Sequence, residues 1–344
     1  MSGAVEVFLD ETPGETRGVV MRDGLYTHLL IQRDGDAPET RLGARSAARV
    51  TEVNPGLRGA FVDLGGAAPA FLPFGRNDRL RQGERLDVVV SAEPRAGKGA
   101  VVRRLGPGEG PPRLLQPAPT IAEQLRDLAP GEESVVGIAA IDAVIEAEEQ
   151  AMARSCGFAG QGIDLSLERT RALIAVDIDH APAPGRDPKQ ARAVANREGL
   201  RQAARLIGLR RWGGLVVIDL VGDGQDAQAQ LVAARAAFGH EPQAVFGSVS
   251  RFGLLELSLP WRRTPVEEIL LDADGAPALQ TRALSLVRRL RRQILSNTAS
   301  PRLVLRCAPQ EAAVAAPLVA ALGPRAAVVG DPAVAPGRGH IEES

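Results

Sequence analysis

Short β-prone runs dominate the first 105 residues of the chain. Residues 4–9 (AVEVFL) and 17–32 (RGVVMRDGLYTHLLIQ) are rich in apolar side chains, and Asp23-Gly24 inside the second run is a residue pair that tight hairpin turns favour. Further runs between residues 43 and 105 are each bounded by glycine, proline, asparagine or aspartate. Strands of this length and spacing predict an antiparallel start followed by a small β-barrel.

Proline and glycine then interrupt the pattern. The segment 106–119 (GPGEGPPRLLQPAP) cannot hold a helix or an interior strand, so it predicts a linker and a domain boundary. Helical patterns follow at 120–128, where Thr120 is the N-cap candidate, and at 140–154.

Apolar strands and helices alternate in the next part of the chain. Strand-like runs at 172–178 and 215–220 flank a helix that begins at Asp187 and Pro188, because aspartate is a favoured N-cap and proline suits the first helical position. A helical pattern at 227–239 and two more strands follow. The order of strand, helix and strand predicts an α/β layer.

A basic amphipathic helix is predicted over 278–295, before a strand, a helix and a strand that together predict a small α/β lobe. The helix carries four closely spaced arginines, Arg288, Arg289, Arg291 and Arg292. They either form a solvated helix face, which is the more common case, or hold a partner or structured RNA.

The composition is that of a globular protein. The 344 residues correspond to two or three compact units, and 44% hydrophobic with 24% charged residues argues against a disordered or fibrous chain. Because 41 basic residues oppose 42 acidic ones, the net charge of −1 excludes attraction of the whole molecule to nucleic acid and leaves only local patches.

The two cysteines, Cys156 and Cys307, are too few and too far apart for a disulfide framework or a four-thiolate zinc site. This usage is consistent with a reducing compartment. The first residues contain acids and no long apolar run, and no window approaches the roughly 20 apolar residues of a membrane span. We therefore expect a cytoplasmic protein without a membrane partner.

Two predicted strands end on carboxylates. Asp177 and Asp219 come at the ends of apolar runs, and Asp179 shares the face of Asp177 if its strand continues. Groups at the carboxyl ends of adjacent strands meet in the crevice where α/β sheets bind ligands, and carboxylate oxygens suit Mg²⁺. From the residues alone, acids that merely begin loops or cap helices are an equally good interpretation.

The predicted barrel carries a second candidate set. Phe61 and Phe71 are among only eight phenylalanines, and exposed aromatics on such a barrel stack unpaired bases. Lys98 lies in a glycine-flanked turn from which it can reach a phosphate. The surrounding arginines make the segment basic: Arg76, Arg79, Arg81, Arg85, Arg95, Arg103 and Arg104. Taken alone, phenylalanines in the core and a solvated arginine face are the more common arrangement.

Other chemistry has no support in the sequence. The four histidines show no metal-ligand spacing, and neither a phosphate-binding G-x-x-x-x-G-K-[ST] loop nor a G-x-G-x-x-G after a strand is present. A site for nucleoside triphosphates is therefore not expected.

Taken together, five motifs in one order resemble the catalytic half of the ribonuclease E/G family, whose members are endoribonucleases that cut single-stranded RNA. The resemblance covers most of the chain, from Glu15 to about Gly330. The motifs are VNPGLRGAFVDLGGAAPAFLPF, GKGA, RTRALIAVDID, NREGLRQAARLIGLRRWGGLVVIDL and SRFGLLELS.

The resemblance implies an α/β fold of several subdomains, with an OB-fold barrel inserted in an RNase H-like subdomain, then a DNase I-like α/β subdomain and a small α/β C-terminal lobe. The implied boundaries are 1–40 and 120–165 for the RNase H-like subdomain, 41–105 for the OB-fold domain, 106–119 for the linker, 166–262 for the DNase I-like catalytic subdomain and 263–344 for the lobe and tail.

The same resemblance implies roles for the candidate residues. Asp177 and Asp219 match the two aspartates that bind the catalytic Mg²⁺, and Asp179 falls where the family has Asn or Asp beside them. The barrel residues Phe61, Phe71 and Lys98 match the residues that grip the RNA. The implied reaction is metal-assisted hydrolysis that leaves a 5′ phosphate and a 3′ hydroxyl.

The sequence also departs from the family. The segment that forms a pocket for an RNA 5′ monophosphate has no counterpart between Leu105 and Thr120, and Gln243 stands where an arginine assists that pocket. The C-P-x-C zinc link between protomers is replaced by WRRTPVEEILLDADGAPAL, so no zinc-linked dimer is expected and the oligomeric state stays open. The alternative function is therefore an RNA-binding protein with weak or no nuclease activity.

Overall fold

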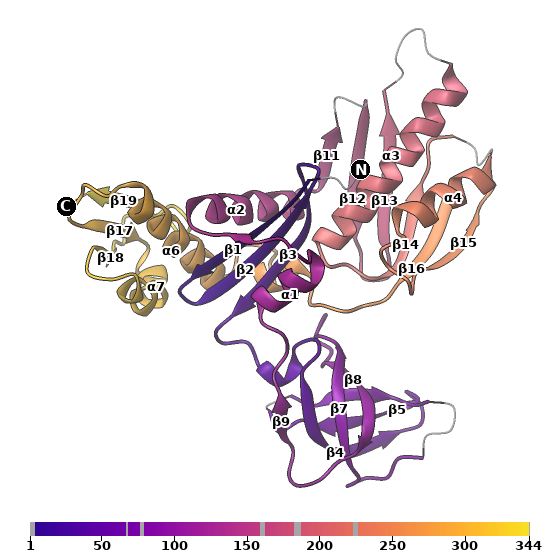
Figure 1. Cartoon of the computed structure of the whole chain (residues 1–344), viewed down its shortest axis with the longest axis horizontal. Helices are drawn as coiled ribbons and strands as arrows, with labels where there is room; N and C mark the ends of the chain where they lie inside the picture. The colour runs from indigo at the N-terminus through magenta and orange to yellow at the C-terminus, as the bar shows by residue number, and fades with distance from the viewer. Residues whose placement is uncertain are drawn as a thin grey trace. The chain divides into compact units, whose positions relative to one another are not determined.

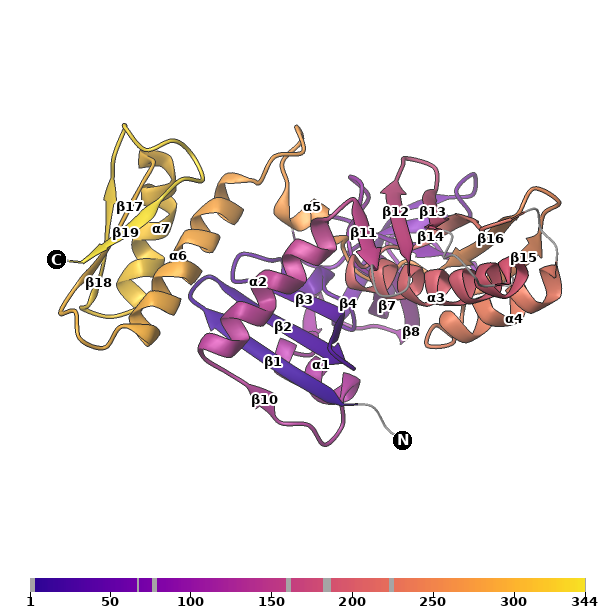
Figure 2. The ribbon, with the colours of Figure 1, turned by 90° about the horizontal axis from the view of Figure 1, so that it is seen from above.

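The computed structural model describes residues 4–66, 68–75, 79–158, 162–181, 187–222 and 226–343. It is a mixed α/β protein whose described residues form several sheets and seven α-helices (Figures 1 and 2). The chain divides into two compact units, one made of residues 1–148 with 264–344 and the other of residues 149–263.

The first unit begins with the predicted antiparallel strands. β1 (Val5–Thr12), β2 (Glu15–Arg22) and β3 (Leu25–Arg33) pair in order, and β10 (Ser134–Val135) adds to β1 in parallel. Asp23 and Gly24 both have positive φ, as a tight primed turn between β2 and β3 requires. The predicted hairpin is therefore confirmed.

Helix α1 (Ile121–Leu128) packs on this sheet, and α2 (Ile138–Met152) follows it. The Thr120 side chain accepts from the Glu123 N–H while the Glu123 carboxylate accepts from the Thr120 N–H, which confirms the predicted N-cap. A Cβ on Gly18 would lie 2.7 Å from Ile121, so only glycine lets the helix approach β2 this closely.

A barrel follows within the same unit. Its strands are β4 (Arg45–Asn54), β5 (Gly59–Asp63), β6 (Ala70–Pro73), β7 (Arg85–Ala92), β8 (Val101–Pro107) and β9 (Arg113–Gln116), with the 3-10 turn Pro38–Thr40 ahead of them. They pair in the order β5-β6-β8-β7-β4-β9, and an additional β4 to β5 pairing closes the barrel. Small and branched side chains such as Ala60, Val62 and Leu86 fill its interior.

The predicted linker needs a correction. β8 continues to Pro107, and β9 lies inside 106–119, so this segment is partly built into the barrel. Among the described strands, β9 pairs with β4 alone, so it is an edge strand, where the flanking prolines are tolerated. Leu114 packs against the barrel core, and this non-local contact is invisible in the local composition of the segment.

Buried ion pairs link the C-terminal lobe of the first unit to the β10-β1-β2-β3 sheet. α5 (Val266–Leu270) precedes α6 (Leu279–Ser296), on which Arg288 is almost fully buried and donates to Asp10 and Glu15 of the first sheet at 2.7 and 2.8 Å. Arg291 also pairs with Asp10. The arginines of this helix therefore form neither a simple solvated face nor a free surface for a partner.

The remaining lobe contains the predicted strand, helix and strand, and one further strand from the C-terminal tail that the sequence did not predict. β17 (Leu303–Cys307) lies between β18 (Ala326–Gly330) and β19 (His340–Glu343), and α7 (Pro309–Ala321) packs with α6 over these strands. No helix among the described residues is long and apolar enough to span a membrane.

The second unit is one mixed sheet. Its strands are β11 (Ser155–Phe158), β12 (Ile163–Arg169), β13 (Ile174–His180), β14 (Gly214–Asp219), β15 (Val245–Val249) and β16 (Leu254–Leu259), in the order β11-β12-β13-β14-β16-β15. Because β11 and β12 belong to it, this sheet begins before the boundary predicted at residue 166.

Helices α3 (Pro188–Leu209) and α4 (Ala227–Ala237) lie on one face of this sheet (Figure 1). Residues alternate along β13, so that Ile174, Val176 and Ile178 are buried while Asp177 and Asp179 are exposed on the opposite face. The parallel β13 and β14 are joined through α3, which confirms the predicted α/β layer.

Candidate functional site

The two predicted metal ligands lie side by side at the ends of β13 and β14. In the parallel register of these strands, Asp177 is the direct partner of Asp219. Neighbouring strands are about 4.8 Å apart, and both residues are exposed on the face opposite to the helices. One small cation can therefore contact both carboxylates.

Further carboxylates lie on the same face. Asp164 on β12 is the register partner of Asp179, and Ser166 is the partner of Asp177. The Asp179 carboxylate accepts a 2.7 Å hydrogen bond from the neighbouring His180 N–H. One oxygen of Asp179 is thus occupied by a backbone N–H, whereas no described residue donates a hydrogen bond to the carboxylates of Asp177 and Asp219.

The electrostatics of this edge favour a cation. Burial raises the pKa of Asp177, and the carboxylates of Asp219, Asp179 and Asp164 raise it further. No described arginine, lysine or histidine forms a salt bridge with Asp177 or Asp219. A divalent ion would relieve this repulsion, and the hard oxygen donors fit Mg²⁺, which is commonly held by one or two carboxylates.

The described residues do not offer a denser metal cage. Among them, no group of three or more His, Cys, Asp or Glu side chains is arranged to hold an ion. A cation held by Asp177 and Asp219 would therefore complete its coordination with water or substrate oxygens, as Mg²⁺ generally does.

A residue that the sequence analysis did not single out holds the chain just after Asp219. The buried Asn196 of α3 donates from Nδ2 to the Val221 carbonyl at 3.1 Å, and its Oδ1 accepts from the Val221 N–H at 2.8 Å. This pair of hydrogen bonds fixes the backbone two residues beyond Asp219. The signal in the sequence was an asparagine within a helix that packs against the strands. A buried amide requires hydrogen-bond partners, and such a residue therefore indicates a fixed neighbouring backbone.

Two glycines allow the close packing around this edge. A Cβ on Gly199 of α3 would lie 2.6 Å from Ile178, so glycine lets the helix rest against β13 next to Asp177. Gly253, at φ +83°, accepts the Leu220 N–H with its carbonyl and lies against the Gly222 carbonyl. Only glycine combines this φ with this contact.

The barrel residues also come together. Phe61 and Phe71 are register partners on β5 and β6, and their rings make an edge-to-face contact with centroids 5.6 Å apart. Both are half-buried and neither belongs to the barrel core, so the more common alternative of two core phenylalanines is wrong. Gly59 makes room for the Phe71 ring, since a Cβ there would lie 2.1 Å from it.

Lys98 lies in an exposed turn between β7 and β8. The turn is closed by hydrogen bonds in both directions between Arg95 and Lys98. Two residues later, the Ala100 carbonyl accepts from the Phe71 N–H at 2.8 Å, so the turn adjoins the amino end of β6. The three predicted RNA-gripping residues thus share one region of the barrel. Of the predicted basic residues around them, Arg76 lies outside the described part of the chain.

These geometries first define a class: an α/β protein with paired strand-end carboxylates in one unit and a barrel with an aromatic pair in the other. Residues 118–260 match the sequence model of the Ribonuclease E/G family. Asp177, Asp219 and Asn196 lie inside the match, whereas Phe61, Phe71 and Lys98 lie outside it.

Two curated relatives agree with the family match. Ribonuclease G of Haemophilus influenzae is 30% identical over 118 residues, which cover 28% of this chain and 24% of that protein. "Putative ribonuclease E" of Buchnera aphidicola subsp. Baizongia pistaciae is 29% identical over 129 residues, which cover 36% of this chain and 32% of that protein. The chain therefore spans about a quarter to a third of the length of these relatives.

Proposed function

We propose that this protein is a cytoplasmic, Mg²⁺-dependent endoribonuclease that hydrolyses single-stranded RNA to products with a 5′ phosphate and a 3′ hydroxyl, in RNA processing or decay. The observation that carries the proposal is the register pairing of Asp177 with Asp219 on an exposed sheet face, within the segment that matches a ribonuclease family.

Asp177 and Asp219 would hold the ion, which when bound there neutralises charge on the scissile phosphate and promotes attack by water. Both carboxylates must be ionised for this role. Asn196 acts as a positioning residue, because its two hydrogen bonds to Val221 hold the end of β14 against α3. Asp179 adds negative charge beside the pair.

The barrel supplies binding in this proposal. Phe61 and Phe71 stack unpaired bases, and Lys98 holds the RNA backbone through its charge. We assign the barrel to the OB-fold class because five of its six strands, β4 to β8, form a ring that the β4 to β5 pairing closes, and OB folds bind oligonucleotides. We likewise assign the β10-β1-β2-β3 sheet to an RNase H-like subdomain and the second unit to a DNase I-like subdomain.

The test is a cleavage assay on an internally labelled, A/U-rich single strand, with and without Mg²⁺. We expect wild-type protein to give Mg²⁺-dependent products, and Asp177→Asn and Asp219→Asn to lose the activity while keeping their circular dichroism spectra. Glu168→Gln is the matched control, since Glu168 is exposed on the same face but lies opposite Ala175. Equal cleavage by both aspartate variants would remove the site from the mechanism.

A second candidate function is RNA binding without efficient cleavage. It is favoured by the barrel, which carries all three of the expected RNA-binding residues, Phe61, Phe71 and Lys98. It is also favoured by the family match, which covers residues 118–260 and leaves the barrel outside. Its signature is RNA binding that weakens with salt and with Phe61→Ala or Phe71→Ala, without Mg²⁺-dependent products after long incubation.

A further inference from the structure

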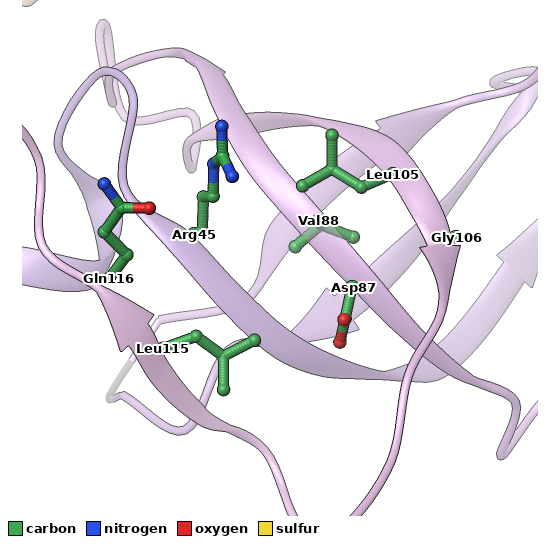
Figure 3. Close-up of a pocket in the computed structure, with 7 residues that line it drawn as sticks. All are labelled: Arg45, Asp87, Val88, Leu105, Gly106, Leu115 and Gln116. Atoms are coloured by element: carbon green, nitrogen blue, oxygen red, sulfur yellow. The ribbon is translucent and has the colours of Figure 1, made fainter.

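An unassigned hollow of about 350 Å³ lies on the outer surface of the barrel, where β9, β4, β7 and β8 run side by side (Figure 3). Its lining residues are Arg45, Asp87, Val88, Leu105, Gly106, Leu115 and Gln116. None of them belongs to the aromatic pair or the Lys98 turn. The volume is at the lower end of the range for small-ligand sites.

Two β-bulges build its apolar walls. Between the β7 and β8 partners Asp87–Gly106 and Val88–Arg104, Leu105 is left without a register partner. Leu115 is the corresponding extra residue between the β4 and β9 pairings. Bulges redirect side chains, and these two leucines are 44% and 46% exposed although they lie on strands. In Figure 3 they extend from opposite rims toward Val88, which lies between them.

Polar groups with free hydrogen-bonding capacity surround these walls. The side chains of Arg45, Asp87 and Gln116 have neither a salt bridge nor a hydrogen bond to another described residue. Arg45 and Asp87 extend toward different sides of Val88 (Figure 3). The hollow therefore offers guanidinium donors and carboxylate acceptors beside two half-exposed leucine side chains.

Several arginines lie close in sequence to the residues that line the hollow. Arg103 and Arg104 directly precede Leu105 on β8, and Arg113 begins β9. Arg113 donates to the backbone carbonyls of Glu109 and Pro111 and forms no ion pair with a described residue, whereas Arg104 is ion-paired with Glu84 at 3.6 Å. Exposed leucine side chains beside an arginine suit a flat base, and further arginines on the neighbouring strands suit its flanking phosphates.

We propose that this hollow binds an unpaired base of the RNA strand, between Leu105 and Leu115. The inference rests on the proposed function in taking RNA as the ligand, and it adds a base contact separate from Phe61 and Phe71. Guanine fits the polar rim best, because its O6 and N7 can accept from Arg45 while its N1–H and exocyclic amine donate to Asp87.

The experiment measures binding of labelled single-stranded oligonucleotides by fluorescence anisotropy in EDTA, so that cleavage does not interfere. One oligonucleotide carries a single guanine in a uridine background, and the second carries inosine there, which lacks the exocyclic amine. We expect wild-type protein to bind the guanine strand several-fold more tightly than the inosine strand, and Asp87→Asn to bind both alike.

The double variant L105A/L115A should weaken binding of the guanine strand about tenfold with an unchanged circular dichroism spectrum, because both leucines lie outside the barrel core. Leu295→Ala, which removes an equally exposed leucine from α6, is the matched control and should bind normally. Equal affinity of wild-type protein for guanine and inosine strands would overturn the base assignment.

The remaining outcomes separate this inference from the proposed function. Normal RNA binding by L105A/L115A together with weak binding by Phe61→Ala would refute the hollow as a base site and leave the proposed function standing. Absence of RNA binding by wild-type protein would refute both. Self-association that L105A/L115A abolishes, without effect on RNA binding, would assign the hollow to a protein contact instead.

Discussion

Replacing Asn196 with alanine tests how the metal edge is held in place. The change removes two hydrogen bonds to Val221, of 3.1 and 2.8 Å, from a side chain that is only 3% exposed. A net hydrogen bond contributes about 1 kcal/mol, so the two together predict a loss of about 2 kcal/mol in the free energy of unfolding. Because Val221 is two residues from Asp219, the released backbone also loosens a proposed ligand. Groups that orient metal ligands typically change metal affinity or activity by about 10- to 100-fold.

The assay is the Mg²⁺ concentration that gives half-maximal cleavage, measured beside a thermal unfolding curve. We expect the Mg²⁺ concentration for half-maximal cleavage to rise by about 10-fold or more in Asn196→Ala, and high Mg²⁺ to restore part of the activity. Gln202→Ala is the matched control, since Gln202 is a buried amide of the same helix whose side chain, among the described residues, bonds to Glu198 and Arg205 and not to the β14 end. If both variants lose similar stability and Asn196→Ala keeps the wild-type Mg²⁺ requirement, the positioning role is refuted.

Four further tests address the metal edge, the barrel, the RNA 5′ end and the oligomeric state. Burial and neighbouring carboxylates raise the pKa of Asp177, so the stability of the metal-free protein falls as the pH rises through that pKa. Asp177→Asn should therefore raise the melting temperature at pH 7, and should leave it unchanged below a pH of about 3.9, where the carboxyl is protonated in both the folded and the unfolded state. A lower melting temperature of the variant at pH 7 would contradict this. Gly59→Ala should push the Phe71 ring aside and weaken RNA binding with the spectrum of a folded barrel retained; unchanged affinity would separate that ring from binding. Substrates with a 5′ monophosphate or a 5′ triphosphate should be cleaved at similar rates, and sedimentation should not respond to zinc chelation; a strong monophosphate preference would reveal a 5′-end pocket.

Local features of the chain were predictable because their causes are local. The Asp23-Gly24 turn, the Thr120 capping box and the helix start at Asp187 and Pro188 each depend on residues within one turn of one another. The resemblance to the ribonuclease family, seen in sequence motifs, is confirmed over 118–260 by the family match.

Features that depend on distant contacts were not predictable in the same way. The sequence of 106–119 predicts a linker. β9 forms in this segment because it pairs with the edge of β4 and because Leu114 packs against the barrel core. The sequence pattern predicts a solvated position for Arg288. It is buried instead, because the carboxylates of Asp10 and Glu15, more than 270 residues away in the chain, accept hydrogen bonds from its guanidinium group.

The candidate site shows the same division. Apolar runs that end on Asp177 and Asp219 are visible in the sequence, because strand ends and carboxylates are properties of single segments. That the two acids are direct register partners, that Asn196 holds the chain beyond one of them, and that Leu105 and Leu115 border a hollow were decided by strand register and bulges. The sequence by itself determined which elements form and which chemical groups they carry. Only the tertiary structure decided which groups meet, because register and packing follow from the sum of many weak contacts between distant segments.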